Sequence, residues 1–258
     1  YMEYGAKFLG KTTVLAKDTP AFIANRIGVF SMMNLLHEIK GLGLNVSDID
    51  KLTGPIIGRP KSATFRTADV VGLDTLVMVA DGVRNSKMEA NDFNNVFELP
   101  DYVQKMVENK WLGSKSQQGF YKKIKHTEGK SEIHGLNLDT MEYELQGKSE
   151  FPTLELTKNI DKPIDRFKVL VGGKDKAGEL YRKSLGALFA YVSHKVPEIA
   201  DEVYKIDDAM RAGFGWENGP FEIWDAIGVQ KGIELAKDAG YEVSDWVKTV
   251  DSFYKVND

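Results

Sequence analysis

The chain has 258 residues, a formal net charge of −4 and no cysteine, which excludes disulfides, thiolate metal sites and a cysteine nucleophile. Its 42% apolar and 28% charged residues are typical of a globular protein rather than a disordered one. Lysines spread among acidic residues argue against a nucleic-acid surface, and no apolar stretch approaches the about 20 residues of a membrane span. No charged-then-apolar leader opens the sequence. We therefore expect a cytoplasmic protein without nucleic-acid or membrane partners.

The first strong helical pattern covers residues 20–39. Asp18 or Thr19 can cap its amino end, and Pro20 suits the first turn, where its missing N–H needs no partner. Apolar residues then recur at helical spacing until the Gly-Leu-Gly of residues 41–43, which ends the helix.

Further elements follow along the chain. A short helix starts at Ser47 and stops at Gly54. Alternating residues around Asp139 predict one β-hairpin over residues 131–147. The remaining predicted helical segments are residues 64–84, 101–110, 153–159 and 174–193, with a further run within 197–240. The sequence therefore predicts a mainly α fold with one hairpin and no Rossmann domain.

An internal repeat organises the chain. Ile49-Asp50 matches Ile206-Asp207, and Gly58 matches Gly215 at the same offset of 157 residues. After one deletion, Phe, Asp and Gly residues match again at an offset of 156, in the pairs Phe65 and Phe221, Asp69 and Asp225, and Gly72 and Gly228. Because repeated helical units bury one another's apolar faces, we interpret this pattern as a duplication. The expected domains are residues 1–130 (first helical repeat), 131–150 (hairpin and linker) and 151–258 (second helical repeat).

Three strings resemble the C-terminal domain of the 3-hydroxyacyl-CoA dehydrogenase family. Residues 17–27, KDTPAFIANRI, are nearly identical to the string that opens the family's helical domain. The repeated Asp, Gly and Phe unit is the second string. Residues 115–122, KSQQGFYK, are similar to the family's basic segment that ends in Gly-Phe-Tyr. Two copies joined by a hairpin resemble the longer family members, in which the region is often fused to an enoyl-CoA hydratase domain.

The resemblance implies roles for two residues. Asn25 matches the family asparagine that faces the substrate, and an amide can donate to a substrate oxygen while it accepts from a neighbour. Lys115 matches a family lysine that approaches the nicotinamide cofactor, although Gln117 stands where the family usually has glycine. The family's catalytic histidine and its carboxylate partner belong to the nucleotide-binding domain, so we expect no catalytic residue in this chain.

The sequence offers no dinucleotide motif of its own. A nicotinamide cofactor normally binds where a Gly-x-Gly-x-x-Gly motif joins a strand to a helix. Gly172, Gly173 and Gly178 have the wrong spacing for this motif. We expect them to form a turn before a helix. The four histidines (His37, His126, His134 and His194) are expected to pack or to be solvated, and no metal-ligand spacing occurs. NAD would therefore be bound mainly by an absent Rossmann domain.

Other residues receive structural expectations. Arg26 is expected to pair with a carboxylate and fix its helix, and Asp69 and Asp225 to hold turns or helix starts. Arg59 and Lys61 lie on a loop that is expected to be solvated, although either could meet a CoA phosphate.

The sequence leaves three functions open. The first is the substrate-facing part of an NAD-dependent 3-hydroxyacyl-CoA dehydrogenase of β-oxidation, inactive without an upstream nucleotide-binding domain and able to form a homo-oligomer. The second is a non-catalytic module for helical dimerisation or acyl-CoA binding. The third is the helical domain of a different 3-hydroxyacid dehydrogenase. Because residue 1 is Tyr rather than Met, we expect a processed or excised segment.

Overall fold

The computed structural model describes residues 1–86, 91–126, 130–147 and 149–255. The fold is mainly helical, with one small antiparallel sheet, which confirms the predicted fold class. The α-helices are α1 (Met2–Leu9), α2 (Ala24–Leu42), α3 (Val46–Thr53), α4 (Phe65–Val71), α5 (Leu73–Arg84), α6 (Asn91–Asn94), α7 (Asp101–Glu108), α8 (Pro152–Glu155), α9 (Pro163–Gly172), α10 (Lys176–Lys195), α11 (Val203–Phe214), α12 (Pro220–Ile227) and α13 (Val229–Asp238). The 3-10 helices are η1 (Pro55–Ile57), η2 (Asn95–Phe97), η3 (Ser114–Ser116) and η4 (Asp245–Thr249), and the strands are β1 (Tyr121–Lys125), β2 (Ser131–Leu136) and β3 (Tyr143–Glu144).

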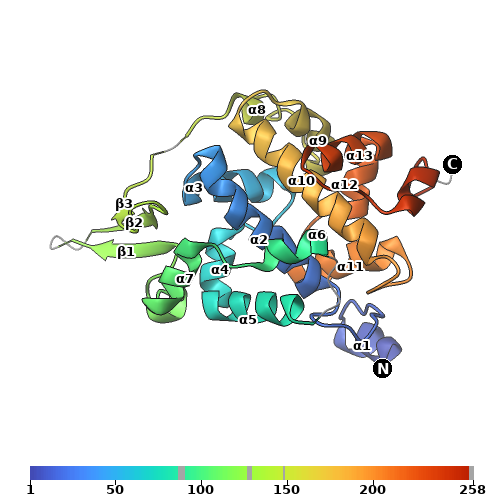
Figure 1. The fold of residues 1–258 in the computed structure, drawn as a ribbon, viewed down its shortest axis with the longest axis horizontal. Coiled ribbons are helices and arrows are strands. Elements are labelled where there is room, and N and C mark those ends of the chain that lie inside the picture. The colour runs from blue at the N-terminus through green and yellow to red at the C-terminus, as the bar shows by residue number, and fades with distance from the viewer. Residues whose placement is uncertain (87–90, 127–129, 148, 256–258) are drawn as a thin grey trace.

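Two long helices form the centre of the molecule. Helix α10 packs against α2 on one side and against α9 and α13 on the other, while α2 also contacts α5 and α11 (Figure 1). Phe30 of α2 and Tyr191 of α10 stack with ring centroids 3.8 Å apart, and both are fully buried. Such aromatic contacts add to the free energy gained by burial alone. The α2–α10 pair is therefore the frame on which both halves of the chain are built.

The first long helix begins four residues later than the sequence predicts. Pro20 lies in a turn, and Ala21 and Phe22 adopt positive φ angles of 64° and 52° before α2 begins at Ala24. Two successive residues in the left-handed region cannot continue a right-handed helix. The predicted capping by Asp18 or Thr19 is therefore wrong, because Ile23 is the N-cap residue and no side chain caps the helix.

Other helix boundaries depend on caps and glycines. Helix α3 begins at Val46, one residue before the predicted start at Ser47, and the side-chain oxygen of Asn45 caps it by accepting from the Asp48 N–H. The predicted helix over residues 64–84 is two helices, because Gly72 lies between them with a φ of 99°. Helix α9 was not predicted as a separate element. Among the described residues, no helix is both long and apolar enough to cross a membrane.

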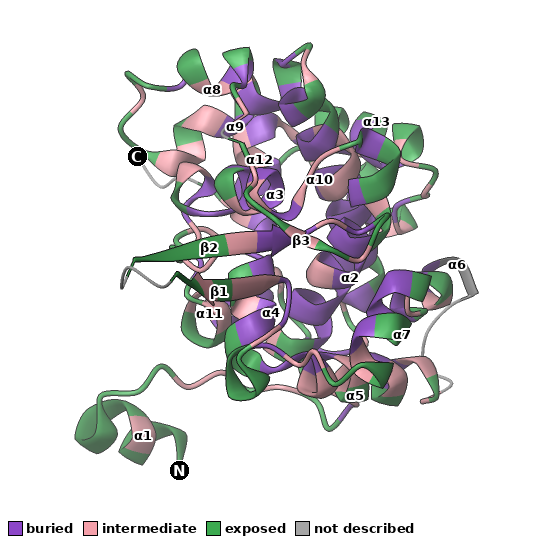
Figure 2. Cartoon of the chain, turned by 90° about the vertical axis from the view of Figure 1, so that its left-hand side faces the viewer, coloured by how far each residue is buried: buried purple, intermediate pink, exposed green. Residues whose placement is uncertain are grey.

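The predicted hairpin is present, but it belongs to a three-stranded antiparallel sheet in the order β1-β2-β3 (Figure 2). The additional strand β1 pairs with β2 in the register Tyr121 to Gly135, and β2 pairs with β3 through Leu136 and Tyr143. The sequence of β1 is Tyr-Lys-Lys-Ile-Lys, in which the clean alternation of a strand with one buried face is missing. The sequence therefore predicted two of the three strands and missed β1.

Matching aspartates bind the start of corresponding helices in the two halves. Asp50 accepts from the Phe65 N–H at 2.6 Å, at the start of α4, and from the Tyr121 hydroxyl at 2.8 Å. Asp207 accepts from the Phe221 N–H at 3.0 Å, in the first turn of α12, and from the Tyr254 hydroxyl at 2.7 Å.

A second pair of aspartates fastens distant segments. Asp69 accepts from the N–H groups of Phe120 and Tyr121, at 2.8 and 2.9 Å. Asp225 accepts from the N–H groups of Phe253 and Tyr254, at 2.9 Å each. The expectation that Asp69 and Asp225 hold turns or helix starts is wrong, because both sit inside helices and bind Phe-Tyr segments far along the chain. The same paired positions thus make the same contacts, while the duplication itself stays a proposal.

Candidate functional site

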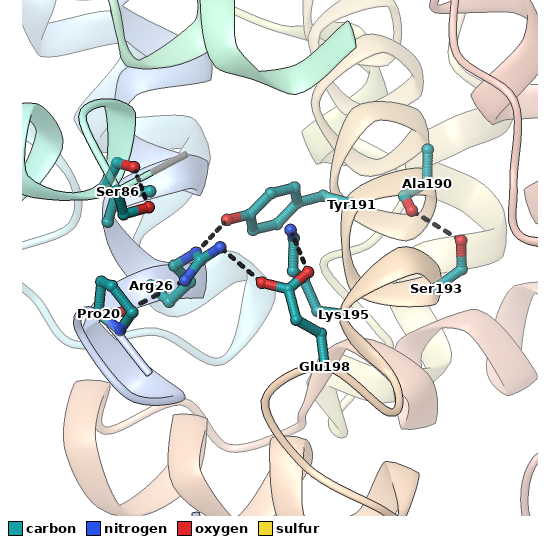
Figure 3. Close-up of polar contacts among 9 residues, drawn as sticks. Pro20, Arg26, Ser86, Ala190, Tyr191, Ser193, Lys195 and Glu198 are labelled. Carbon is teal, nitrogen blue, oxygen red and sulfur yellow. Dashed lines mark hydrogen bonds and ion pairs between the residues drawn. The ribbon is translucent and has the colours of Figure 1, made fainter. Parts of the chain in front are cut away.

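The first turn of α2 is held by a buried ion-pair network. The guanidinium of Arg26 donates to Glu198 at 2.8 Å, to the Tyr191 hydroxyl at 3.0 Å and to the Pro20 carbonyl at 3.2 Å. Glu198 also accepts from Lys195 at 2.8 Å, and Figure 3 shows these side chains converging between the two central helices. Breaking a buried pair leaves an uncompensated charge. Arg26 therefore fixes its helix as expected, and fixes with it the neighbouring position 25.

Asn25 is exposed and lines an open groove of about 270 Å³. The walls come from α2, the loop before α4, α4, α5 and the end of α11. The lining residues are Asn25, Val29, Met32, Pro60, Ser62, Thr67, Ala68, Val71, Thr75, Leu76, Val79, Gly213 and Phe214. Most of these side chains are aliphatic, so the groove suits an apolar chain. The Asn25 amide can donate to, or accept from, a polar group on such a chain.

Lys115 lies beside the groove rather than in it. Its ammonium contacts both carboxylate oxygens of Asp74, with a 2.5 Å distance to Oδ2. This hydrogen bond lowers the pKa of Asp74. Asp74 is in the first turn of α5, next to Thr75 and Leu76, which line the groove. Both residues predicted for the site are thus close to α5: Asn25 lines the same groove as α5, and Lys115 binds Asp74 of α5.

A basic cleft lies near this groove. It has a volume of about 750 Å³, and its cationic lining residues are Lys61, Arg66, Lys122, Lys123 and Lys125. Ser62 lines both the cleft and the apolar groove. Of these residues, only Lys61 and Lys122, the last residue of the basic segment 115–122, stood out in the sequence. The Lys-rich segment after Tyr121 is the signal that could have revealed the cleft, had it been recognised as a strand.

Two buried carboxylates have strongly perturbed pKa values without lying in a reactive setting. Burial raises the pKa of Asp69 to about 6 and that of Asp207 to about 7, even though backbone N–H groups stabilise both carboxylates. Both oxygens of each carboxylate accept hydrogen bonds from the protein itself. Such structural networks also perturb pKa values, so we assign both residues to the framework.

The four histidines contact the protein away from Asn25. His37 contacts the Glu98 carbonyl at 2.9 Å, and His194 contacts the Glu242 carbonyl at 3.0 Å. His126 and His134 both approach Glu132, at 3.0 and 3.4 Å. None of the four lines the groove. Within the described ranges, no group of three or more His, Asp or Glu residues is arranged to hold a metal ion.

The glycines that come nearest to a dinucleotide motif form a different structure. Gly172 ends α9 and Gly173 follows it, and Asp175 then caps α10 by accepting from the Gly178 N–H at 3.0 Å. These glycines therefore form a turn between two helices, as expected, and not a crossing from a parallel strand. The described part of the chain contains only the antiparallel sheet.

Residues 22–123 match the family model described as the 3-hydroxyacyl-CoA dehydrogenase, C-terminal domain. Residues 22–123 therefore belong to the C-terminal domain of the 3-hydroxyacyl-CoA dehydrogenase family. The matched residues include Asn25 and the groove residues that α2, α4 and α5 contribute, so the groove lies mainly on the family domain.

Individual proteins are similar in sequence to almost the whole chain. A probable 3-hydroxyacyl-CoA dehydrogenase of Bacillus subtilis (strain 168) is 43% identical over 245 residues, which are 95% of this chain and 30% of that protein. A Rickettsia prowazekii protein, named as a trifunctional enzyme of a fatty acid oxidation complex, is 26% identical over 89% of this chain and 30% of its own length. The chain thus spans less than a third of the length of each of these two relatives.

A solved structure supports the fold alone. The crystal structure of 3-hydroxybutyryl-CoA dehydrogenase from Escherichia coli K12 aligns with a TM-score of 0.58 and 19% identity, over 93% of this chain and 61% of that one. The two chains therefore share a fold over the aligned part.

Proposed function

We propose that this chain forms the substrate-facing wall of an NAD-dependent 3-hydroxyacyl-CoA dehydrogenase, which oxidises (3S)-3-hydroxyacyl-CoA to 3-oxoacyl-CoA in β-oxidation. The observation that carries the proposal is the exposed Asn25 amide in a largely apolar groove. The aliphatic walls would hold the acyl chain, and the amide would bind an oxygen of the 3-hydroxy or 3-oxo group.

The redox chemistry needs a neighbouring nucleotide-binding domain. NAD accepts the hydride when it is bound, and a base on that domain would remove the hydroxyl proton. From this chain, Lys115 would approach the cofactor, held in place by Asp74 until the domains close. Lysine can serve such a role because its ammonium is a compact charge on a flexible stem. A hydratase domain and a second subunit are further partners in this proposal.

Exposed apolar side chains near the groove favour such contacts. Phe22, Val70 and Met78 are 57%, 71% and 67% exposed, and they belong to the segments that form or flank the groove. A surface of this kind is typical of residues that another domain or subunit covers. The same observation favours the alternative function, a non-catalytic module that binds acyl-CoA or a second subunit.

The test joins the chain to a family nucleotide-binding domain placed before Tyr1. We expect NADH-dependent reduction of acetoacetyl-CoA by the fused protein and none by the chain alone. Asn25→Ala should lower kcat/KM about tenfold or more, because a lost hydrogen bond to a substrate oxygen costs about 1.5 kcal/mol. Asn109→Ala, at an exposed helix end, is the matched control.

The outcomes separate the two functions. A fused protein that turns over equally well with Asn25→Ala would remove Asn25 from the site. A fused protein that binds acetoacetyl-CoA but never reduces it would favour the non-catalytic module.

A further inference from the structure

Arg59 occupies a position that joins the two halves of the molecule. It follows η1 and Gly58 in the first half, and its guanidinium carbon lies 3.8 Å from the ring centroid of Trp216 in the second half. Stacking on an indole face is a favourable contact for a guanidinium. The side chain is thereby held in one place, although part of it remains exposed.

The charge of Arg59 has no counter-ion in the described part of the chain. No acidic side chain there lies within ion-pair distance of it, and its guanidinium makes no hydrogen bond to described residues. Burial lowers the pKa of Arg59 to about 10, so the group is still protonated at neutral pH. Half-burying a charge without a counter-ion removes part of its hydration at a cost. This cost suggests that an anion completes the site.

The space beside Arg59 adjoins the groove of Asn25. A small cavity of about 30 Å³ is lined by Arg59 together with Ser31 of α2. Ser31 is buried, and its hydroxyl has no hydrogen-bond partner among the described residues. The cavity and the groove share four lining residues, which are Met32, Pro60, Thr67 and Phe214. A ligand in the groove can therefore extend toward two unused donors, the guanidinium and the hydroxyl.

We propose that Arg59 and Ser31 bind a carboxylate at the far end of an acyl chain whose thioester end lies near Asn25. This inference rests on the function proposed above and deepens it: the substrates include 3-hydroxyacyl thioesters of dicarboxylic acids. Two oxygens on one carbon match the planar donors of a guanidinium.

The dimensions favour a carboxylate over a phosphate. A cavity needs about 10–15 Å³ to hold one water molecule, so the space of about 30 Å³ beside Arg59 takes one or two oxygen-sized groups. A phosphate carries four oxygens. Ser31 lies six residues after Asn25 on α2, or about 9 Å along the helix. The chain between the two ends is therefore of medium length.

The experiment compares suberyl-CoA with octanoyl-CoA, two thioesters of equal carbon number that differ in the terminal carboxylate. Titration calorimetry on the 258-residue chain measures both dissociation constants. We expect suberyl-CoA to bind at least tenfold more tightly, because hydrogen bonds to charged groups contribute about 1.5–3 kcal/mol. Equal affinities of the unaltered chain for the two thioesters would overturn the inference while leaving the proposed function in place. If neither thioester binds, both proposals fail.

Variants locate the preference. Arg59→Met should abolish it, because the planar donors are lost, and Ser31→Ala should reduce it in part. Lys61→Met removes a neighbouring cation that lines the basic cleft rather than the cavity, so it is the matched control and should retain the preference. Arg59→Lys, which keeps the charge but not the planar donors, should show an intermediate preference and guards against a folding defect in Arg59→Met. A preference that survives Arg59→Met, or that is lost in Lys61→Met alone, would contradict the assignment.

Discussion

The two halves of the chain share a framework of hydrogen bonds but carry different charges on it. In the first half, Arg66 at the start of α4 stacks over Tyr121 at 4.1 Å and lines the basic cleft. In the second half, the corresponding position is Glu222, which accepts from the Gly219 N–H at 2.8 Å and pairs with Arg211. At this position the first half therefore carries an exposed cationic side chain, whereas the second half carries an acidic side chain that is paired within the protein.

The residues that hold the fold together are shared by the two halves, whereas the residues of the candidate site are not. The framework aspartates Asp50, Asp69, Asp207 and Asp225 make matching contacts in both halves. Asn25 and its groove belong mostly to the first half, and Phe214 and Gly213 of the second half close one side of it. We infer that one half supplies the polar groups of the site and that the other mainly supports it.

The largest expected effect tests whether the two frameworks are equivalent. Asp50→Ala and Asp207→Ala each leave buried N–H and hydroxyl donors without an acceptor, and each should lower the free energy of unfolding by about 2–4 kcal/mol. Urea unfolding of both variants measures the effect. If one variant kept almost all of its unfolding free energy while the other was severely destabilised, the two frameworks would not be equivalent.

The pH dependence of stability sharpens the same comparison. Burial raises the pKa of Asp69 to about 6 and of Asp207 to about 7 from an ordinary value of 3.8. The folded chain then binds more protons than the unfolded chain between these values, so the stability present below about pH 4 is lost as the pH rises through about 7.

Urea unfolding across this pH range should show that fall in stability. Asp207→Asn should flatten it mainly near pH 7, and Asp69→Asn mainly near pH 6, since each removes one titrating group. A stability that rises steadily over the range would contradict the assignment of these two carboxylates.

The smallest effect on stability is expected at Lys115. Its pair with Asp74 is exposed, and exposed ion pairs contribute little to stability. Lys115→Ala should leave the unfolding midpoint almost unchanged. In the protein fused to a nucleotide-binding domain, the same variant should raise the KM for NADH, whereas Lys110→Ala should not. An unchanged KM would remove Lys115 from the cofactor site.

The sequence was informative where local pattern and family strings coincide. The mainly helical fold, the ends of α2 at Gly43 and of α3 at Gly54, and the pairing of Arg26 with a carboxylate all follow from residue type and spacing. The start of α2 did not follow, because nothing in Ala21 or Phe22 signals a positive φ. Thr19 is buried, and no side chain caps α2.

Long-range contacts were the other limit. The Phe-Tyr segment of the second half, Phe253 and Tyr254, escaped notice because it lies 133 residues from Phe120 and Tyr121, not 156. Its equivalence is visible only in the hydrogen bonds to Asp225 and Asp207. Arg59 was expected on a solvated loop, and this expectation was wrong, because Trp216 from the other half stacks on it. Tertiary partners of this kind cannot be read from spacing.

The most direct test of the central claim follows the side-chain amide of Asn25 by NMR while acetoacetyl-CoA is added to the chain. We expect the side-chain amide signals of Asn25 to shift until they reach saturation. The backbone amide signals of Val29 and Thr67, which line the same groove, should shift with them. Shifts confined to the lysines of β1, with Asn25 unmoved, would contradict the claim that this groove holds the acyl group.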